Sequence, residues 1–251
     1  MKFSHALLSH AGGRSSNQDC CDFAAQGEMR CWVVADGLGG HRGGETAARL
    51  AVAGILASFR ETPDPGAEAV RRHLEKAQQA ILKRQEEEPA LASMRTTAIV
   101  LLADGPRALW GHIGDSRLYH FGPQGLDFQT MDHSVPQALV RAGKIAPGQI
   151  RYHEDRNRLL RTLGHEGKFE PEILEEAHPL EAGDAFLLCT DGFWEYVTEL
   201  EMEVDLARAD GPEAWLAHME QRLQRRASGK HDNYSAIGVF VAAPEAGEET
   251  S

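Results

Sequence analysis

Aspartates that directly follow apolar runs are the residues of this sequence best placed to do chemistry. Asp36 follows Cys-Trp-Val-Val-Ala, and Asp191 follows Phe-Leu-Leu-Cys-Thr. Five glycines among residues 37–44 come after Asp36, which indicates backbone that passes close to another group. A carboxylate at a strand end, beside exposed carbonyl groups, suits Mg²⁺ or Mn²⁺ because these cations prefer oxygen ligands.

Three further aspartates have similar surroundings. Asp115 lies at a junction between two predicted strands, Asp232 just before the last one, and Asp19 ahead of the first strong one. The five residues are far apart in sequence, so their spacing alone does not establish a shared metal site.

Asp-Gly is ordinarily a turn signal, and this alternative applies to each Asp-Gly pair here. Asp104-Gly105 lies between two predicted strands and predicts a hairpin turn. Asp210-Gly211-Pro212 precedes a predicted helix. Asp36 and Asp191 differ from these two because each opens into a segment unlike a short hairpin.

The elements that must position these side chains can be read from periodicity and turn residues. Short apolar runs predict strands at 31–35, 97–103, 108–113, 117–121, 185–190 and 235–242. Helices are predicted at 44–59, 68–87, 135–142 and 213–226. Strict strand–helix alternation is missing, and short turns join the strands of residues 97–121. This favours antiparallel sheet covered by helices.

The net charge of −12 disfavours nonspecific binding to nucleic acid or to anionic membranes. Anionic substrates would therefore need local positive charge from a bound cation or an arginine. The four cysteines form no CxxC pair, so a zinc site of the usual spacing is not predicted. This cysteine usage fits a reducing, cytoplasmic compartment.

Eight segments, in order along nearly the whole chain, resemble the metal-dependent protein phosphatases (type 2C Ser/Thr phosphatases) in their bacterial single-domain form. They are GGRSSNQD (12–19), VVADGLGGHRGGETAA (33–48), RTTAIV (95–100), HIGDSRLYHF (112–121), MDHS (131–134), NRLLRTLG (157–164), LCTDGFWEYV (188–197) and HDNYSAIGVF (231–240). The resemblance implies an α+β fold, in which two antiparallel sheets pack as a sandwich with helices on both outer faces. We expect one domain at 1–242 and a flexible acidic tail at 243–251.

The resemblance also implies a set of metal ligands for two Mn²⁺ or Mg²⁺ ions. Asp36 would bridge the two ions, and the carbonyl group of Gly37 would bind one of them. Asp191 and Asp232 would complete the protein ligands of the other ion, and Asp19 would act near the second metal through water.

Two more roles follow from the same resemblance. Asp115, with Asp191, resembles the pair that holds a third metal in bacterial members, and Arg14 would bind the substrate phosphate. A water molecule that bridges the two cations would attack phosphorus directly, so no covalent phosphoenzyme is expected. The implied partners are phosphorylated Ser/Thr proteins and a cognate Ser/Thr kinase, for a monomeric enzyme that binds neither nucleic acid nor membrane.

The sequence departs from the family pattern at a few positions. Gln18 replaces the glutamate of many members, and Arg95 replaces a glycine. Leu38 lies where animal members carry a histidine proposed as general acid. His41 is the nearest histidine, and it is read either as a general acid or as a structural or substrate-facing residue.

Residues 134–158 correspond to the flap segment beside the active site of bacterial relatives. They carry five basic residues, Arg141, Lys144, Arg151, Arg156 and Arg158. We interpret this segment as a mobile, partly basic surface that contacts the phosphoprotein. An ordinary helix and loop with solvated charges is the alternative.

Three functions are weighed. The first is a phosphatase acting on phosphoserine and phosphothreonine, which opposes a bacterial Ser/Thr kinase, with type VI secretion control as one pathway hypothesis. The second is a catalytically silent relative that binds phosphoproteins or a kinase, against which Asp36, Asp191, Asp232 and Arg14 all argue. The third is a two-metal phosphodiesterase acting on nucleic acid, which the acidic charge disfavours.

Overall fold

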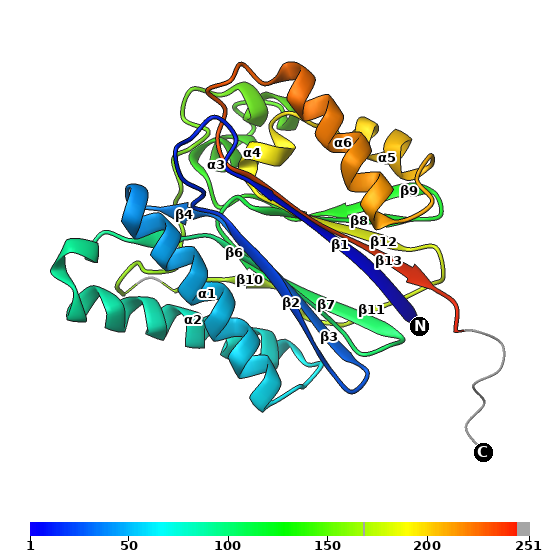
Figure 1. The fold of residues 1–251 in the computed structure, drawn as a ribbon, viewed down its shortest axis with the longest axis horizontal. Coiled ribbons are helices and arrows are strands. Elements are labelled where there is room, and N and C mark those ends of the chain that lie inside the picture. Colours follow the sequence, from blue (N-terminus) through cyan, green and yellow to red (C-terminus); the bar gives the residue numbers. More distant parts are fainter. Residues whose placement is uncertain (168, 245–251) are drawn as a thin grey trace.

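The computed structural model describes residues 1–167 and 169–244, apart from the side chain of His41. Two antiparallel sheets lie face to face, and helices cover both outer faces (Figure 1). The predicted sandwich is therefore confirmed. Most of the expected acidic tail, residues 245–251, lies outside the described residues.

The first sheet contains both the earliest and the latest strand of the described chain. Its order is β1 (Lys2–His10), β13 (Tyr234–Ala242), β12 (Ala185–Cys189), β8 (Arg117–Gly122) and β9 (Gly125–Gln129). β1 pairs with β13 along its whole length, from Lys2 opposite Ala242 to His10 opposite Tyr234. Segments more than 200 residues apart are thereby held side by side.

The second sheet is built around the most apolar strands. Its order is β10 (Glu172–Ile173), β7 (Arg107–Ile113), β6 (Ala98–Ala103), β3 (Met29–Ala35) and β2 (Cys20–Gln26), and β11 (His178–Pro179) also pairs with β7. A separate short pair joins β4 (Gly37–Leu38) to β5 (Arg95–Thr96).

Two helical layers enclose the sandwich (Figure 1). α1 (His41–Glu61) and α2 (Ala67–Glu87) pack on the second sheet, whereas α6 (Pro212–Arg226) packs on β1 and β13 with α5 (Glu199–Leu206) beside it. The shorter helical segments are η1 (Pro89–Leu91), α3 (Val135–Arg141), η2 (Pro147–Tyr152) and α4 (Asp191–Trp194).

The apolar spacing predicted helix α2 and its buried face correctly. Val70, Leu74, Ala77 and Ile81 are fully buried, as the stripe predicts, because they face the second sheet and α1. α1 begins three residues before the predicted start at Gly44. β1, β2, β9 and α5 were not predicted.

The layer between the sheets is apolar. Trp32, Ile99 and Phe186 belong to one buried cluster that spans both sheets. Burying a side chain of this size contributes about 1.5–3 kcal/mol, so this layer contributes substantially to the stability of the sandwich.

All four cysteines are free thiols, and Cys31 and Cys189 are buried as predicted. Burial raises the pKa of both thiols above the ordinary range, so they pack as small apolar groups. Within the described residues, no helix is long and apolar enough to cross a membrane.

One ion pair is fully enclosed in the first sheet. The Arg117 guanidinium donates two hydrogen bonds of 2.8 Å to the two carboxylate oxygens of Asp132, and both side chains are at most 5% exposed. The guanidinium carbon also lies 3.5 Å from the ring centre of Trp194. Glu199 lies 3.6 Å from the guanidinium but is partly exposed, so removing Asp132 takes away the buried, hydrogen-bonded partner of the Arg117 charge.

We therefore predict that Asp132→Ala lowers the free energy of unfolding by about 3–5 kcal/mol, measured by denaturant titration. Asp155→Ala is the matched control, because it removes the more exposed pair with Arg158 and costs about 1 kcal/mol or less. Equal losses for the two variants would contradict the assignment of Arg117–Asp132 as a structural pair.

Candidate active site

Aspartates at the ends of strands from both sheets lie at one edge of the sandwich. Asp36 follows β3 and Asp191 begins α4 two residues after β12, whereas Asp232 precedes β13 by two residues. Asp115 lies between β7 and β8. The structure therefore brings together residues whose sequence separation gave no hint of contact.

These side chains meet in a small cavity of about 180 Å³. It is lined by Arg14, Gln18, Asp36, Gly37, Leu38, Gly39, Asp115, Asn157, Leu159, Asp191, Asp232 and Asn233. Asp19 lies buried below this lining, where its carboxylate accepts a 2.9 Å hydrogen bond from the Thr190 hydroxyl. Of the predicted site residues, His41 alone has its side chain outside the described part of the chain.

Backbone contacts fix Asp36. Its N–H donates to the Thr97 hydroxyl over 3.0 Å, and its carbonyl accepts from the Thr97 N–H and the Thr96 hydroxyl. Gly37 follows where a Cβ atom would lie 2.1 Å from the Gly44 carbonyl oxygen, so no side chain fits. The backbone around Asp36 is thus held without using the carboxylate.

Asn233 ties the segment of residues 11–18 to the start of β13. Its amide group donates to the carbonyls of Ala11 and Ser16, and its side-chain oxygen accepts from the Gln18 N–H. The Asn233 carbonyl also lies where a Cβ on Gly192 would be only 2.0 Å away. This one side chain positions the segment that carries Arg14 and Asp19.

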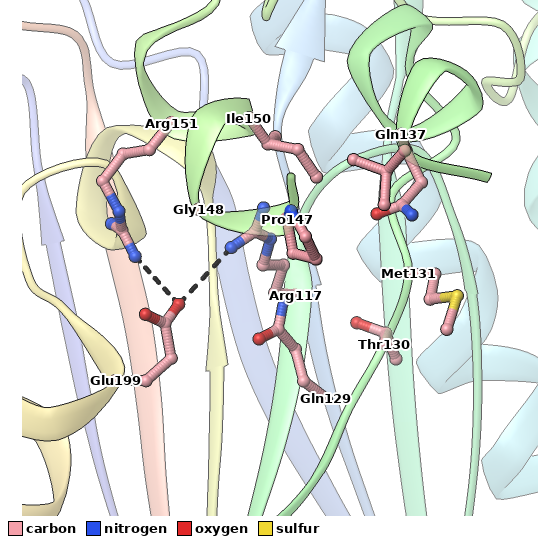
Figure 2. Close-up of a pocket in the computed structure, with 11 residues that line it drawn as sticks. Arg117, Gln129, Thr130, Met131, Gln137, Pro147, Gly148, Ile150, Arg151 and Glu199 are labelled. Atoms are coloured by element: carbon pink, nitrogen blue, oxygen red, sulfur yellow. Dashed lines mark hydrogen bonds and ion pairs between the residues drawn. The ribbon is translucent and has the colours of Figure 1, made fainter. Parts of the chain in front are cut away.

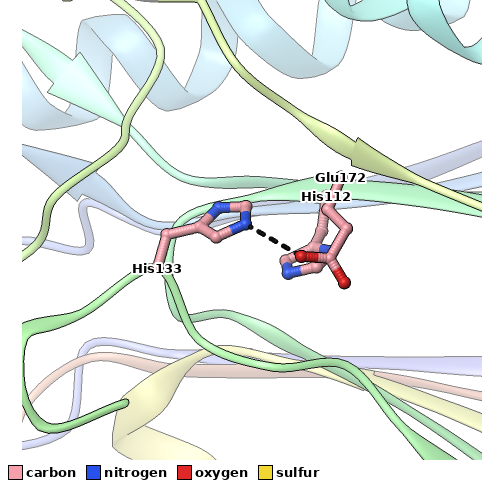
Figure 3. A group of neighbouring side chains, drawn as sticks. All are labelled: His112, His133 and Glu172. Atoms are coloured by element: carbon pink, nitrogen blue, oxygen red, sulfur yellow. Dashed lines mark ion pairs between the residues drawn. The ribbon is translucent and has the colours of Figure 1, made fainter. Parts of the chain in front are cut away.

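Asp115 is held through its own carbonyl and its neighbour Gly114. Trp194 Nε1 donates to the Asp115 carbonyl over 3.0 Å. The backbone N–H of Gly114 donates to the ring nitrogen Nδ1 of His133 over 3.1 Å, and the backbone N–H of His133 donates to the Gly114 carbonyl. Figure 3 shows the His133 ring with its other nitrogen, Nε2, directed at Glu172, 3.6 Å away.

Several acidic side chains are concentrated in this cavity. Burial and the neighbouring aspartates raise the pKa of Asp36 well above its ordinary value, and the same two causes act on Asp115. Burial first, then Glu195 and Asp232, raise the pKa of Asp191 to about 7. Buried carboxylates without enough nearby cationic side chains fit a site for divalent cations, since bound cations offset this repulsion.

Arg14 lies at the mouth of the cavity. Its Nη2 donates a 2.8 Å hydrogen bond to Asp232 Oδ2, and about half of each side chain is exposed. The guanidinium therefore lies beside the carboxylates and remains accessible to an anion arriving from solvent.

Comparisons with known proteins agree with this geometry. A family model described as protein phosphatase 2C matches residues 8–143. "Serine/threonine phosphatase stp" of Listeria monocytogenes is 36% identical over 176 residues, which cover 68% of this chain and 69% of the relative. The chain belongs to the protein phosphatase 2C family. It is a metal-dependent protein Ser/Thr phosphatase.

Two solved structures extend the likeness over almost the whole chain. The catalytic domain of the serine/threonine phosphatase PstP, in complex with two manganese ions, has a TM-score of 0.81 and 30% identity, covering 96% of this chain and 99% of that one. "PppA, a key regulatory component of T6SS in Pseudomonas aeruginosa" has a TM-score of 0.76 and 27% identity, covering 96% and 98%.

Residues 134–158, which we interpret as a flap, present fewer unpaired basic side chains than their sequence suggests. Arg151 is 9% exposed and donates a 2.8 Å hydrogen bond to Glu199, so the expectation of a surface charge there is wrong (Figure 2). Arg156 pairs with Glu195, Arg158 with Asp155, and Arg141 lies 3.6 Å from Glu172. A cavity of about 440 Å³ lies between this flap and β8, lined partly by Arg117 and Glu199.

Several supporting residues were not assigned a role from sequence. Thr97, Asn233 and Thr190 each lie within a segment that carries the family resemblance, and Asn233 and Thr190 directly adjoin a proposed ligand. Their polar side chains within largely apolar strand ends were the available signal. Their partners come from distant segments, so the hydrogen bonds themselves could not be read from sequence.

We predict that Asp36→Asn raises the melting temperature of the metal-free phosphatase in EDTA, because it removes one of several repelling carboxylates. A gain of about 1 kcal/mol would shift the midpoint by about 2–4 °C in a chain of this length. Added Mn²⁺ should stabilise the wild type and stabilise the variant far less, as measured by calorimetry.

Asp210→Asn is the matched control, since Asp210 is exposed and outside the cavity. It should leave both midpoints unchanged. A variant Asp36→Asn less stable than the wild type in EDTA would show that the carboxylate stabilises the fold by itself, contrary to the repulsion argument.

Proposed function

We propose that this phosphatase hydrolyses phosphoserine and phosphothreonine on proteins in one step, without a covalent phosphoenzyme. The observation that carries the proposal is the convergence of acidic side chains from separate strand ends around one small cavity. A volume of about 180 Å³ suits a phosphate group with its cations better than a large ligand.

The assignment of ligands follows the family pattern residue by residue. Asp36 and the Gly37 carbonyl, with Asp191 and Asp232, would hold two divalent cations, and Asp19 would act through water. Asp115, opposite Asp191, would hold a third. Oxygen-only donors favour Mn²⁺ or Mg²⁺ over softer metals, and the PstP catalytic domain described above was solved with manganese.

When bound, the two cations supply a nucleophilic hydroxide at neutral pH and offset charge on the phosphoryl oxygens. The remaining work falls to the chain. Arg14 would orient the phosphate through its planar guanidinium, which can donate two parallel hydrogen bonds. Asp19 stays buried beside Thr190, where it would accept a hydrogen bond from a water molecule in the cavity.

For His41 we propose two alternative roles, general acid or substrate-facing residue. It begins α1, directly after the glycine-rich segment that borders the cavity. Leu38 lines the cavity where animal members carry histidine, so this apolar side chain cannot deliver a proton.

We further propose that the phosphatase opposes a bacterial Ser/Thr kinase. Its likeness to PppA, described as a key regulatory component of T6SS, supports type VI secretion as a pathway. A kinase gene and secretion-sheath genes beside this gene would support that pathway.

The setting we propose is a monomer in the cytoplasm, with residues 1–242 as one phosphatase domain. The net charge of −12 speaks against a nucleic-acid substrate. A catalytically silent phosphoprotein-binding module is the competing function, and turnover of p-nitrophenyl phosphate with Mn²⁺ separates the two. Absence of EDTA-sensitive turnover would favour the silent module.

Replacement of a proposed ligand tests the metal assignment. We predict that Asp191→Asn lowers kcat/KM by more than about 100-fold, since even loss of residues that merely support a metal ligand costs about 10–100-fold. Circular dichroism should show an unchanged fold, and Asp210→Asn should keep full activity. Near-normal turnover by Asp191→Asn would overturn the assignment.

Arg14 has a separate test. Arg14→Ala should lower kcat/KM by about 10- to 100-fold, because a hydrogen bond to a charged group contributes about 1.5–3 kcal/mol. Arg14→Lys should recover only part of this loss, since it keeps the charge but lacks the planar fork. Arg225→Ala, at an exposed position on α6, is the control. Equal activity of all three variants would remove Arg14 from phosphate binding.

A further inference from the structure

A second group of metal-binding side chains lies at the end of the sandwich opposite the catalytic cavity. It comprises His120, His178 and Asp184, whose ligand atoms all lie within 4.8 Å of one another. His120 is in β8, Asp184 directly precedes β12, and His178 is in β11 on the edge of the second sheet. The three residues therefore come from both sheets: Asp184 lies where β12 starts, and His120 lies toward the finish of β8.

His120 has an unsatisfied buried nitrogen. Its side chain is 2% exposed, and its Nε2 atom has no hydrogen-bond partner among the described residues. The ring is held by stacking on Phe186, with ring centres 4.7 Å apart. An unpaired buried polar atom costs about 1–3 kcal/mol, so a fixed side chain in this state calls for a ligand.

Asp184 presents one free carboxylate oxygen to the same spot. Its Oδ2 accepts a 2.8 Å hydrogen bond from the Glu181 N–H, while Oδ1 faces His120 Nε2 at 3.5 Å. The side chain is 4% exposed, and within the described residues its ion-pair partner is His120 alone. Burial is the largest cause that lowers the pKa of His120, and the nearby Asp184 carboxylate opposes this shift.

The separation of these two atoms is informative. At 3.5 Å they are too far apart for a good hydrogen bond. Two ligands at about 2.0–2.1 Å from a tetrahedral zinc ion are separated by about 3.3 Å, which is close to the observed distance. His178 completes the group, because its ring lies edge-on to His120 with centres 4.6 Å apart.

A second pair of neighbouring histidines serves as a contrast. His112 and His133 lie near Glu172 in a similar group (Figure 3). His133 Nδ1 accepts a hydrogen bond from the Gly114 N–H, so its Nε2 atom carries the proton and has no lone pair for a metal. His112 Nε2 is 2.9 Å from the Met131 carbonyl and therefore donates to it. Similar residue types thus differ in what their hydrogen bonds leave free.

We propose that His120, His178 and Asp184 form a binding site for one Zn²⁺-class cation that links the two sheets and is separate from the catalytic ions. Two imidazole nitrogens and one carboxylate oxygen select borderline metals such as Zn²⁺ and Co²⁺ over Mg²⁺. The site is independent of the catalytic assignment, since none of its residues lines that cavity.

A cation there would tie the isolated two-residue strand β11 to the first sheet. The edge of the second sheet is otherwise joined to the first at this end by packing of Trp110, whose ring centre lies 6.1 Å from that of Phe186. Binding to the folded state alone stabilises it, so the metal should raise the melting temperature.

The test uses Co²⁺ as a spectroscopic probe on the full chain, with Mg²⁺ in large excess. Four-coordinate Co²⁺ with imidazole ligands absorbs visible light far more strongly than six-coordinate Co²⁺ with oxygen ligands. We expect one strongly absorbing equivalent per chain in the wild type, displaced by one equivalent of Zn²⁺. His178→Ala and Asp184→Asn should each lose this band and weaken Co²⁺ binding at least tenfold.

Controls separate this site from the catalytic one. His165→Ala removes an imidazole outside the group and should keep the band, as should Asp36→Asn. All variants except Asp36→Asn should retain Mn²⁺-dependent turnover. Asp184→Asn keeps an oxygen for the Glu181 N–H, and His178 is only partly buried, so we expect both variants to fold, which circular dichroism checks. A band that survives in His178→Ala, or that disappears in Asp36→Asn, would overturn the proposal.

Discussion

The repulsion among aspartates gathered at one end of the sandwich is the constraint on which the site depends. Burial and mutual charge raise the pKa values of Asp36, Asp115 and Asp191, so the polypeptide alone holds this arrangement at a cost. The fold tolerates this cost because hydrogen bonds of backbone groups and neighbouring side chains, and not of the carboxylates, hold these residues in place. Thr97 fixes the backbone of Asp36, and Asn233 fixes the segment of residues 11–18.

Because backbone groups and neighbouring side chains hold the aspartates in place, the strands between their ends can be apolar. Antiparallel strands carry few polar groups into the interior, so their ends can hold charged side chains in fixed directions without competing interactions. The buried Arg117–Asp132 pair supports the cavity from outside. Arg117 lies over Trp194, and Trp194 donates a hydrogen bond to the Asp115 carbonyl. Contacts from Arg117 through Trp194 to Asp115 thereby connect the cavity lined by Arg117 to the cavity that holds the aspartates.

The sequence indicated most of the residues that line the cavity, but not the side chains that support them. The proposed ligands were found because they stand inside ordered motifs, and α2 because its apolar spacing is regular. β1 was missed because its residues are mostly exposed or half-buried, so neither a clean alternation nor an apolar run marks it. α5 had a readable signal, since Thr198 and Glu201 form a capping box. The pairing of Arg151 with Glu199 depends on folding of distant segments, so no local pattern could reveal it.

The pairing of β1 with β13 bears on how the enzyme is made in the cell. Within the described sheet, β13 is the sole neighbour of β1, and it begins two residues after Asp232. A nascent chain whose last strand is still inside the ribosome therefore lacks both a partner for its first strand and one proposed ligand. A nascent chain whose residues 232–242 are still inside the ribosome should therefore have no phosphatase activity.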